Sequence, residues 1–380
     1  MNIVFVSMAL NIHQIGVSDE LYRLTGGKFC FIETGYGTKG VQKGGESEFA
    51  SRSFLIKVKN SSTSQKSVAL QIIRDADMMI FGAAPIEYLK ERVKTGKLTF
   101  VYSERWFKRG ILNLLSPRLL QQQWFYHIHC HGKPVYALCA SAYAAGDFAK
   151  MFSFKNKCFK WGYFTSVSEL DIENIQKSKR CVSTVKILWV ARFLQLKHPF
   201  RMLQLASLLR NRDVDFSINM IGVGPEYDKI GSAIQTMGLE NYVHLLGRVS
   251  NNEVMEAMRT HDIFCFTSDK NEGWGAVLNE AMSSGCCPVS SIETGSTPYL
   301  IKDGINGLSF DLKKEDDLFE KVLWLIEHPE EREKMSIEAY KTMRDVWSPK
   351  NAATQLVKLC KIMQSGDGAL VADGPCSRAL

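Results

Sequence analysis

The most informative stretch of this 380-residue chain is Asn271-Glu272-Gly273-Trp274-Gly275-Ala276-Val277-Leu278-Asn279-Glu280. It follows the apolar segment Ile263–Phe266, which predicts a buried strand, and it passes through a glycine-containing turn into a helix that we expect to begin at about Ala276. A strand, a glycine turn and a helix in this order predict one βα unit of a parallel sheet. The free N–H groups at the start of such a helix favour an anion, so a diphosphate can bind there.

Glu272 and Glu280 place two carboxylates in this stretch. In a fully helical segment, eight residues would separate them by about 12 Å along the axis, which is comparable with the distance between the sugar and the ribose of a nucleotide sugar. Each carboxylate can accept hydrogen bonds from hydroxyl groups. Taken alone, the pair is also compatible with a polar loop residue and an exposed helix residue.

A second stretch carries two cations: Val190-Ala191-Arg192-Phe193-Leu194-Gln195-Leu196-Lys197-His198-Pro199. Arg192 comes directly after a predicted strand, and Lys197 precedes a predicted helix. Open α/β sheets bind their ligands at the carboxyl ends of the strands, so both cations are placed to hold a diphosphate. Without the first stretch, an Arg and a Lys in a loop would indicate only surface charge.

Outward from these motifs, the chain alternates short apolar segments with amphipathic ones, which predicts parallel-sheet α/β domains. In the first half the predicted strands are Ile3–Ser7, Phe29–Glu33, Met78–Phe81, Thr99–Tyr102 and Val135–Cys139, and the predicted helices are Asp19–Leu24, Ser67–Asp75, Ile86–Lys94 and Ala142–Met151. In the second half the predicted strands are Lys186–Val190, Phe216–Ile221, Val243–Leu246, Ile263–Phe266 and Cys287–Ser290, and the predicted helices are Pro199–Arg210, Glu226–Met237 and Asn351–Met363. The polar stretch Tyr36–Ser64 is predicted to be a long loop or a poorly ordered insertion.

The length and the restart of this alternation predict two domains of roughly 150–200 residues. We expect residues 1–165 to form the first domain, the polar segment Ser166–Thr184 to be a linker, and residues 185–345 to form the second domain. The tail of residues 364–380 is rich in Gly, Ala, Ser and Asp and is predicted to be disordered.

Composition limits the compartment and the partners. The ten cysteines are scattered without a CxxC pair, and Met1–Leu10 lacks the basic region of a signal peptide, so we expect reduced thiols and a cytoplasmic location.

Residues 1–180 carry a net charge of +11 and residues 181–380 carry −4, from the Lys, Arg, Asp and Glu of the sequence. The basic half could contact an anionic membrane surface at the inner face of the cytoplasmic membrane or hold an acidic acceptor, and it is equally compatible with solvated surface charge. No nucleic-acid-binding module is recognisable.

Together these motifs resemble the donor-binding domain of the retaining GT-B glycosyltransferases of family 4, also called group 1. The resemblance covers roughly Lys186–Phe310. It rests on the Arg-x4-Lys and Glu-x7-Glu motifs above and on four further segments, which are Gly222-Val223-Gly224-Pro225, Leu246-Gly247-Arg248-Val249, Gly285-Cys286-Cys287-Pro288-Val289 and Asp303-Gly304-Ile305-Asn306-Gly307-Leu308. It implies two Rossmann-like domains that face each other across a cleft, and a final helix, at about residues 350–363, that packs back on the first domain.

The resemblance also implies roles for individual residues. Glu272 would contact the donor sugar, and Arg192 and Lys197 would neutralise the leaving diphosphate without a metal ion or other cofactor. The further donor-binding residues implied are Glu280 at the ribose, Gly222, Gly224, Arg248, Gly273, Trp274 and Gly275. Trp274 stands where the family usually has Phe.

In the first half, three segments look similar to bacterial surface-polysaccharide glycosyltransferases: Ser103-Glu104-Arg105-Trp106-Phe107, Leu138-Cys139-Ala140-Ser141-Ala142-Tyr143 and Lys160-Trp161-Gly162-Tyr163-Phe164. His13 and Glu104 each follow a predicted strand, so we expect them at the ligand-binding edge of the sheet. His13 could bind a sugar hydroxyl or the diphosphate or shuttle a proton, and Glu104 could orient the acceptor hydroxyl or take its proton. The alternatives are that His13 is an ordinary loop histidine and that Glu104 forms a surface ion pair with Arg105 or Lys108.

His127, His129 and His131 would lie on one side of an extended chain. A structural zinc site needs four ligands and no partner cluster is visible nearby, so we expect no metal site.

The expected activity is therefore transfer of a hexose from a nucleotide-sugar donor, with a UDP-sugar favoured, to a glycan or lipid-linked acceptor in surface polysaccharide synthesis. The alternatives are a non-catalytic donor-binding subunit of a transferase complex and another GT-B enzyme, such as an epimerase.

Overall fold

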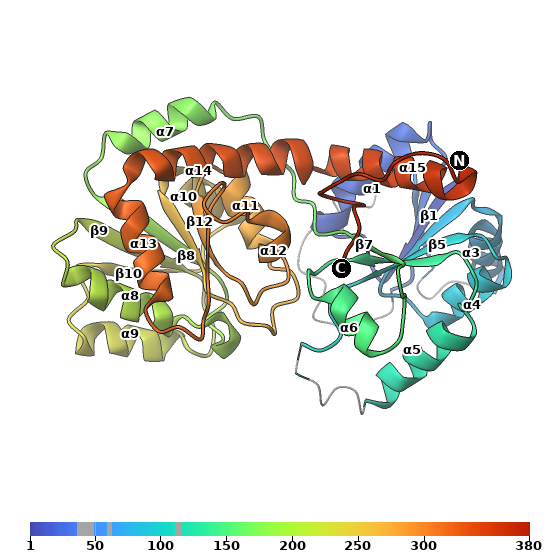
Figure 1. Cartoon of the computed structure of the whole chain (residues 1–380), viewed down its shortest axis with the longest axis horizontal. Helices are drawn as coiled ribbons and strands as arrows, with labels where there is room; N and C mark the ends of the chain where they lie inside the picture. The colour runs from blue at the N-terminus through green and yellow to red at the C-terminus, as the bar shows by residue number, and fades with distance from the viewer. Residues whose placement is uncertain (36–48, 50, 59–62, 109, 111–115) are drawn as a thin grey trace. The chain divides into compact units, whose positions relative to one another are not determined.

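The computed structural model describes residues 1–35, 49, 51–58, 63–108, 110 and 116–380. The chain forms two compact units, which Figure 1 colours along the chain. Unit 1 contains Met1–Ser166 and Trp347–Leu380, and unit 2 contains Val167–Val346. No helix in the described ranges is long and apolar enough to cross a bilayer.

The sheet of unit 1 has seven strands in the order β3-β2-β1-β4-β5-β6-β7, and all neighbouring pairs are parallel. Its strands are β1 (Ile3–Ser7), β2 (Phe29–Glu33), β3 (Leu55–Lys57), β4 (Met78–Phe81), β5 (Leu98–Ser103), β6 (Val135–Cys139) and β7 (Cys158–Lys160). The strand order reverses between β1 and β4, so the loops that follow these strands part at that point of the carboxyl edge. Such a switch point is where open α/β sheets bind ligands.

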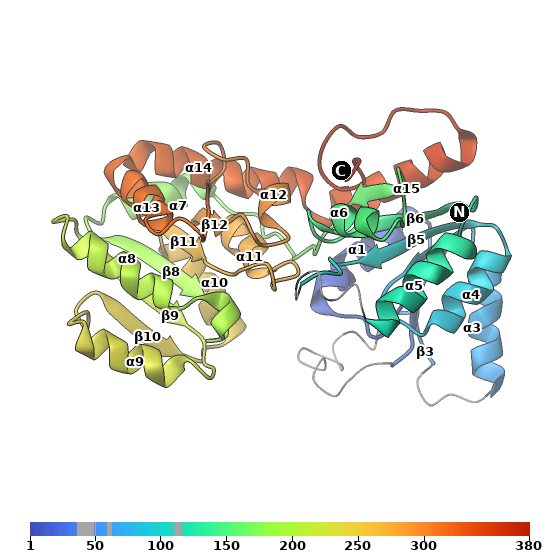
Figure 2. The ribbon, with the colours of Figure 1, turned by 60° about the horizontal axis from the view of Figure 1, so that its bottom comes forward.

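In the described residues of unit 1 the helices are α1 (Ile12–Leu24), α3 (Thr63–Asp75), α4 (Ile86–Lys94), α5 (Pro117–Ile128), α6 (Ala144–Lys150) and α15 (Pro349–Ser365). Figure 2 shows α3 and α4 side by side, and the two helices are in contact. The C-terminal helix α15 packs on α1, where a Cβ atom on Gly16 would lie 2.9 Å from the Pro349 ring. The last helix of the chain thereby belongs to the same unit as the first strand.

Unit 2 repeats the architecture with six parallel strands in the order β10-β9-β8-β11-β12-β13. These are β8 (Val185–Val190), β9 (Phe216–Ile221), β10 (Val243–Gly247), β11 (Ile263–Phe266), β12 (Cys287–Ser291) and β13 (Leu308–Phe310). Its helices are α7 (Ile172–Arg180), α8 (Phe200–Arg210), α9 (Tyr227–Thr236), α10 (Asn251–Thr260), α11 (Val277–Ser283), α12 (Thr297–Leu300), α13 (Asp317–Glu327) and α14 (Pro329–Lys341), with a 3-10 turn η2 (Gln195–Lys197) and a π turn η3 (Thr342–Val346). The predicted α/β fold class is confirmed for both units.

Each unit has an apolar core of its own. In unit 1 the strands contribute fully buried residues such as Val4, Met79 and Ala137, and in unit 2 they contribute Ile187, Ile218 and Val289. The buried strands are nearly continuous apolar runs, as expected for parallel sheets with helices on both faces. This pattern made most of the strands recognisable from the sequence.

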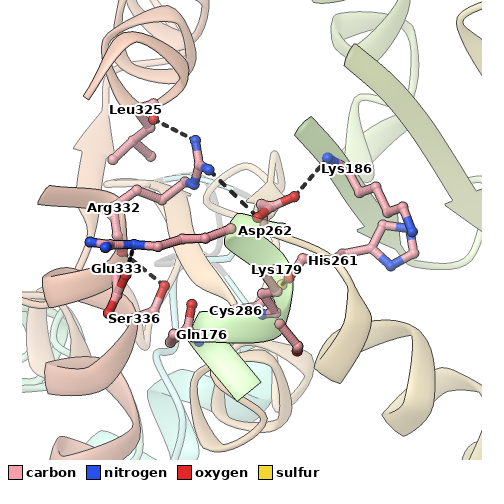
Figure 3. A network of polar contacts seen from close by, with 12 residues as sticks. Gln176, Lys179, Lys186, His261, Asp262, Cys286, Leu325, Arg332, Glu333 and Ser336 are labelled. Atoms are coloured by element: carbon pink, nitrogen blue, oxygen red, sulfur yellow. Dashed lines mark hydrogen bonds and ion pairs between the residues drawn. The ribbon is translucent and has the colours of Figure 1, made fainter. Parts of the chain in front are cut away.

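The segment predicted to be a linker differs from the expectation, because it contains helix α7, which packs on α14 in unit 2. Gln176 Nε2 and Lys179 Nζ donate to the carbonyl of Gly285 at 2.7 and 2.8 Å. Nearby, Asp262 accepts from the N–H of Lys186 at 2.8 Å and lies 3.6 Å from Arg332, as Figure 3 shows. A polar sequence thus forms a docked helix because buried polar side chains satisfy backbone groups.

The C-terminal tail also differs from the prediction of disorder. Its backbone pairs with the edge strand β7, since Lys160 N–H donates to Ser377 O at 2.7 Å and Cys376 N–H donates to Lys160 O at 2.8 Å. Cys376 is buried, and the Arg378 guanidinium lies 4.8 Å from the centre of the Phe159 ring. An edge strand has unpaired backbone N–H and C=O groups. Pairing with those of β7 orders the tail, although the composition of the tail predicts disorder.

Other differences concern short elements. Strands β3, β7 and β13 were not predicted because each has only three residues. Strand β3 lies inside the stretch predicted to be a loop, most of which lies outside the described residues. Helix α5 extends through His127, so the three histidines do not alternate along an extended chain.

We expect that ending the chain at Ser365 lowers the free energy of unfolding of the protein by about 2–4 kcal/mol, because it exposes the β7 edge and removes several backbone hydrogen bonds. Urea unfolding followed by circular dichroism measures the change. The variant Arg378→Ala, which removes only the guanidinium contact of the tail, should lower the free energy of unfolding by less. An unchanged unfolding midpoint in the shortened chain would contradict the role of the tail.

Candidate functional site

The candidate donor site lies in unit 2, where four loops follow strands β8, β9, β10 and β11 at the carboxyl edge of the sheet. The loops after β8 and β11 are fastened to each other. Thr267 Oγ1 donates to Lys197 O at 2.6 Å, Asp269 N–H donates to Leu196 O at 3.0 Å, and Trp189 Nε1 donates to Thr267 Oγ1 at 2.8 Å. The two predicted motifs, Arg-x4-Lys and Glu-x7-Glu, are therefore held side by side.

Lys197 and Glu272 form an ion pair across these loops. The Lys197 side chain is 13% exposed and the Glu272 side chain 18%, so the pair is largely shielded from water. Lys197 Nζ also lies 5.8 Å from the centre of the Phe266 ring. Beside the pair, His198 Nε2 lies 3.2 Å from Asp269 Oδ2. The structure thus brings the predicted sugar-binding carboxylate and one predicted phosphate-binding cation into contact.

Gly222 and Gly224 allow a different pair of loops to meet. A Cβ atom on Gly222 would lie 1.9 Å from Ala191 O, and one on Gly224 would lie 2.6 Å from Phe193 O. Gly222 also has a φ of +130°, which an L side chain rarely adopts. Because Gly222 and Gly224 have no side chains, the backbone of the β9 loop lies directly against the backbone of the β8 loop beside Arg192. The two glycines thereby help to set the position of the β8 loop.

The glycine turn after β11 is constrained in a similar way. Gly275 has a φ of +89°, and a Cβ atom there would lie 2.2 Å from the Phe266 ring. Gly273 is buried. The side chain of Trp274 is 1% exposed and donates from Nε1 to Asn279 Oδ1 at 2.9 Å. The Trp274 indole is therefore part of the interior of unit 2.

Arg192 and Arg248 follow β8 and β10, and both are exposed. Among the described residues neither guanidinium has an ion-pair partner. Both cations lie at the edge where the loops meet and are available to an anion.

Glu280 lies in the first turn of α11. Its carboxyl accepts no hydrogen bond from the described residues, and burial raises its pKa to about 7. An unpaired, partly buried carboxyl is a costly group to keep in a fold. Hydroxyl donors of a ligand would satisfy it.

Unit 1 brings His13 and Glu104 together through a residue that sequence reasoning did not select. The His13 ring stacks on the Tyr163 ring, with centroids 5.0 Å apart and planes inclined by 15°, and the Tyr163 hydroxyl donates to Glu104. Lys108 pairs with the other oxygen of the same carboxylate. Burial lowers the pKa of His13, so its ring is neutral at neutral pH, and its buried Nδ1 makes no hydrogen bond with any described residue.

Tyr163 follows β7, just as His13 follows β1 and Glu104 follows β5. All three therefore lie at the carboxyl edge of the unit 1 sheet. The segment containing Tyr163 was noted for its resemblance to other transferases, but β7 was not predicted, and without that strand the position of Tyr163 could not be derived.

No cluster of His, Cys, Asp and Glu suited to a metal ion occurs within the described ranges. The chemistry that both edges offer is binding of anions and hydroxyl groups by fixed charges and hydrogen bonds.

Unit 2 is thus an open parallel α/β domain with cations and carboxylates at the carboxyl ends of its strands. Residues 171–342 match the family model described as "Glycosyl transferases group 1". This match covers nearly all of unit 2 and confirms the resemblance seen in the sequence.

Curated relatives match over part of their length. An uncharacterized glycosyltransferase of Methanocaldococcus jannaschii is 36% identical over 121 residues, which are 32% of this chain and 34% of the relative. The poly(glycerol-phosphate) alpha-glucosyltransferase of Bacillus subtilis is 25% identical over 158 residues, which are 41% of this chain and 23% of the relative. The chain thus spans between about a quarter and a third of the length of these two relatives.

Solved structures match over nearly the whole chain. A glycosyltransferase from Rickettsia africae gives a TM-score of 0.70 at 14% identity, covering 96% of this chain and 99% of that one. HepE of Anabaena in complex with UDP gives a TM-score of 0.67 at 13% identity, covering 95% of this chain and all of that one. At these identities the likeness establishes a shared two-unit fold, known as GT-B.

We expect Glu280→Gln to change how stability depends on pH. Because burial raises the pKa of Glu280 from 4.5 to about 7, its neutral form favours the folded state below pH 4.5, and this contribution is lost as the pH rises through 7. The variant stays neutral, so at pH 8 it should be more stable than the parent by about 3 kcal/mol, and at pH 4 equally stable. Urea unfolding at both pH values tests this, with the exposed Glu256→Gln as control. Parallel pH curves for parent and variant would contradict the role of burial.

Proposed function

We propose that the protein is a retaining glycosyltransferase that moves a hexose from a nucleotide-sugar donor to a hydroxyl group of a glycan or lipid-linked acceptor in cell-surface polysaccharide synthesis. The observation that carries this proposal is the edge of unit 2, where the Lys197–Glu272 pair, two exposed arginines and the half-buried Glu280 gather around a glycine-shaped backbone. Together they supply cations for a diphosphate and carboxylates for sugar hydroxyls.

The donor is proposed to bind along this edge. Arg192 and Lys197 would hold the diphosphate, with Arg248 adding positive charge from the β10 loop. Glu272 would then exchange its bond with Lys197 for donor-sugar hydroxyls, and Glu280 would accept from the ribose hydroxyls. A UDP-sugar is favoured, since HepE of Anabaena, which shares this fold, was solved with UDP and with UDP-glucose.

Catalysis would follow from charge stabilisation at this site. As the bond between the sugar and the diphosphate breaks, negative charge grows on the departing phosphate, and Arg192 and Lys197 oppose it from fixed positions. Removing one such interaction typically slows a reaction by about 10²–10³-fold. We propose that these side chains make a metal ion unnecessary, so that a chelator leaves the rate unchanged.

The acceptor is proposed to bind at the carboxyl edge of unit 1. Glu104, oriented by Tyr163 and Lys108, would accept a hydrogen bond from the reacting hydroxyl. His13, neutral and with a free Nδ1 among the described residues, would hydrogen-bond a sugar hydroxyl. The names of two relatives support transfer of a sugar, since they are the poly(glycerol-phosphate) alpha-glucosyltransferase of Bacillus subtilis and the D-rhamnosyltransferase WbpZ of Pseudomonas aeruginosa.

Nucleotide binding tests the donor site. We expect a UDP-sugar, without added metal, to raise the melting temperature, because a ligand at 100 times its Kd stabilises a fold by about 2.7 kcal/mol. Arg192→Ala and Lys197→Ala should each weaken binding by about tenfold or more. The control is Lys334→Ala, whose side chain is 66% exposed on α14. If UDP-, GDP-, ADP- and dTDP-sugars all fail to shift the transition, the donor site is assigned wrongly.

Acceptor kinetics test the unit 1 residues. Tyr163→Phe removes the hydroxyl that orients Glu104 but keeps the ring on His13, so we expect kcat/KM for the acceptor to fall by about tenfold while the KM for the donor stays constant. Tyr136→Phe is the control, because Tyr136 lies on β6 within the sheet and contacts Phe100 and Phe159. An equal loss for donor and acceptor would indicate a structural role for Tyr163.

A further inference from the structure

Helix α5 presents an apolar row to the outside of unit 1. Leu120, Trp124 and Ile128 are spaced by four residues, and they are 48%, 62% and 50% exposed. Four-residue spacing places side chains next to one another along one face, and the row extends for about 12 Å. Trp124 is one of seven tryptophans in the chain, and among the described ones it alone belongs to the exposed large apolar residues.

The opposite side of α5 fixes the helix in the protein. Phe125 and Tyr126 are buried in the core of unit 1, and Cys130, just beyond the helix, is buried in the same core. The Tyr126 ring stacks on Trp106 with centroids 6.1 Å apart. These core contacts hold α5, and with it the exposed row, in place without a partner. The exposure of the row is therefore not the result of poor packing of α5 on unit 1.

The polar residues around the row are uncharged. From Leu119 to Gly132 the sequence contains no Lys, Arg, Asp or Glu, and its exposed polar residues include Gln121 and His127. Charged side chains are the most costly groups to bring into the interfacial region of a bilayer, whereas Trp is favoured there. The composition of this face suits contact with lipid headgroups and the outer part of the acyl chains.

The sequence that contains α5 is basic. From Arg105 to Gly146 it carries Arg105, Lys108, Arg109, Arg118 and Lys133 and no Asp or Glu. Of the two acids that flank this segment, Glu104 pairs with Lys108 and Asp147 lies 3.5 Å from Arg105, so these four charges cancel and the sequence keeps an excess of three positive charges.

The same asymmetry holds for the two units as wholes. Unit 1 has 26 Lys and Arg against 13 Asp and Glu, a net charge of +13, whereas unit 2 has 21 against 27, a net charge of −6. A surface that unit 1 binds is therefore expected to be negatively charged.

We propose that the α5 face of unit 1 docks on an anionic lipid bilayer, with Leu120, Trp124 and Ile128 inserted at the headgroup boundary and the net positive charge of unit 1 attracting the anionic headgroups. Apolar insertion and electrostatic attraction together hold a helix in the plane of a membrane surface. This inference is independent of the proposed activity, because none of the three side chains belongs to either candidate site.

Vesicle sedimentation of the full-length protein tests the proposal. We expect binding to vesicles of phosphatidylcholine with phosphatidylglycerol, weaker binding at high salt, and little binding to phosphatidylcholine alone. The triple variant Leu120→Gln/Trp124→Gln/Ile128→Gln should bind at least about tenfold more weakly, because it removes three inserted apolar side chains. Its melting temperature should not fall, since these side chains are exposed.

A matched variant separates this face from exposed apolar surface in general. Val68 on α3 is 57% exposed and Val182 is 47% exposed, so Val68→Gln/Val182→Gln should bind vesicles like the parent. Equal binding by the triple variant, equal binding to neutral vesicles, or no binding to any vesicle would overturn the proposal. Self-association in solution that the triple variant abolishes would also overturn it, by assigning the face to a second copy of the chain.

Discussion

The candidate donor site depends on the close approach of loops at the carboxyl edge of the unit 2 sheet. The β8 and β11 loops are joined by backbone and hydroxyl hydrogen bonds through Thr267, and the β9 loop touches the β8 loop at distances that leave no room for a side chain at Gly222 or Gly224. Because the backbones are fixed, the side chains on them are fixed as well, and Lys197 meets Glu272. A preorganised set of charges is what stabilisation of a leaving diphosphate requires.

Burial gives the charges of this edge different properties. Arg192 and Arg248 are exposed and remain open to an anion, while Lys197 and Glu272 neutralise each other until a ligand competes for them. Glu280 has no hydrogen-bond partner among the residues that the structure describes, and burial raises the pKa of its carboxyl to about 7. A folded protein rarely keeps a half-buried, unpaired carboxyl unless it serves a ligand, so Glu280 supports a binding role more strongly than the motif spacing alone. Unit 1 shows the same principle, because the buried Nδ1 of His13 has no hydrogen-bond partner in the described part of the chain and lies beside the Tyr163–Glu104 hydrogen bond.

Apolar patterning predicted the strands that are buried on both faces, and it placed several of them to the residue, such as Phe216–Ile221 and Ile263–Phe266. It failed where order comes from backbone pairing or buried polar contacts. Helix α7 lies in a segment whose composition suggested a linker, and the hydrogen bonds of Gln176 and Lys179 to Gly285 explain why it docks. The tail is ordered because the edge of β7 supplies partners that no local sequence pattern reveals.

The sequence by itself determined the fold class and the donor-side motifs, because strand periodicity and residue spacing are local properties of the chain. It also gave the charge difference between the halves, which is a matter of counting. Only the tertiary structure decided that the Trp274 indole is interior, that Tyr163 joins His13 to Glu104, and that three apolar side chains of α5 face outward. Those facts depend on which residues from distant parts of the chain become neighbours, and burial and pairing are set by that arrangement and not by the spacing of residues along the chain.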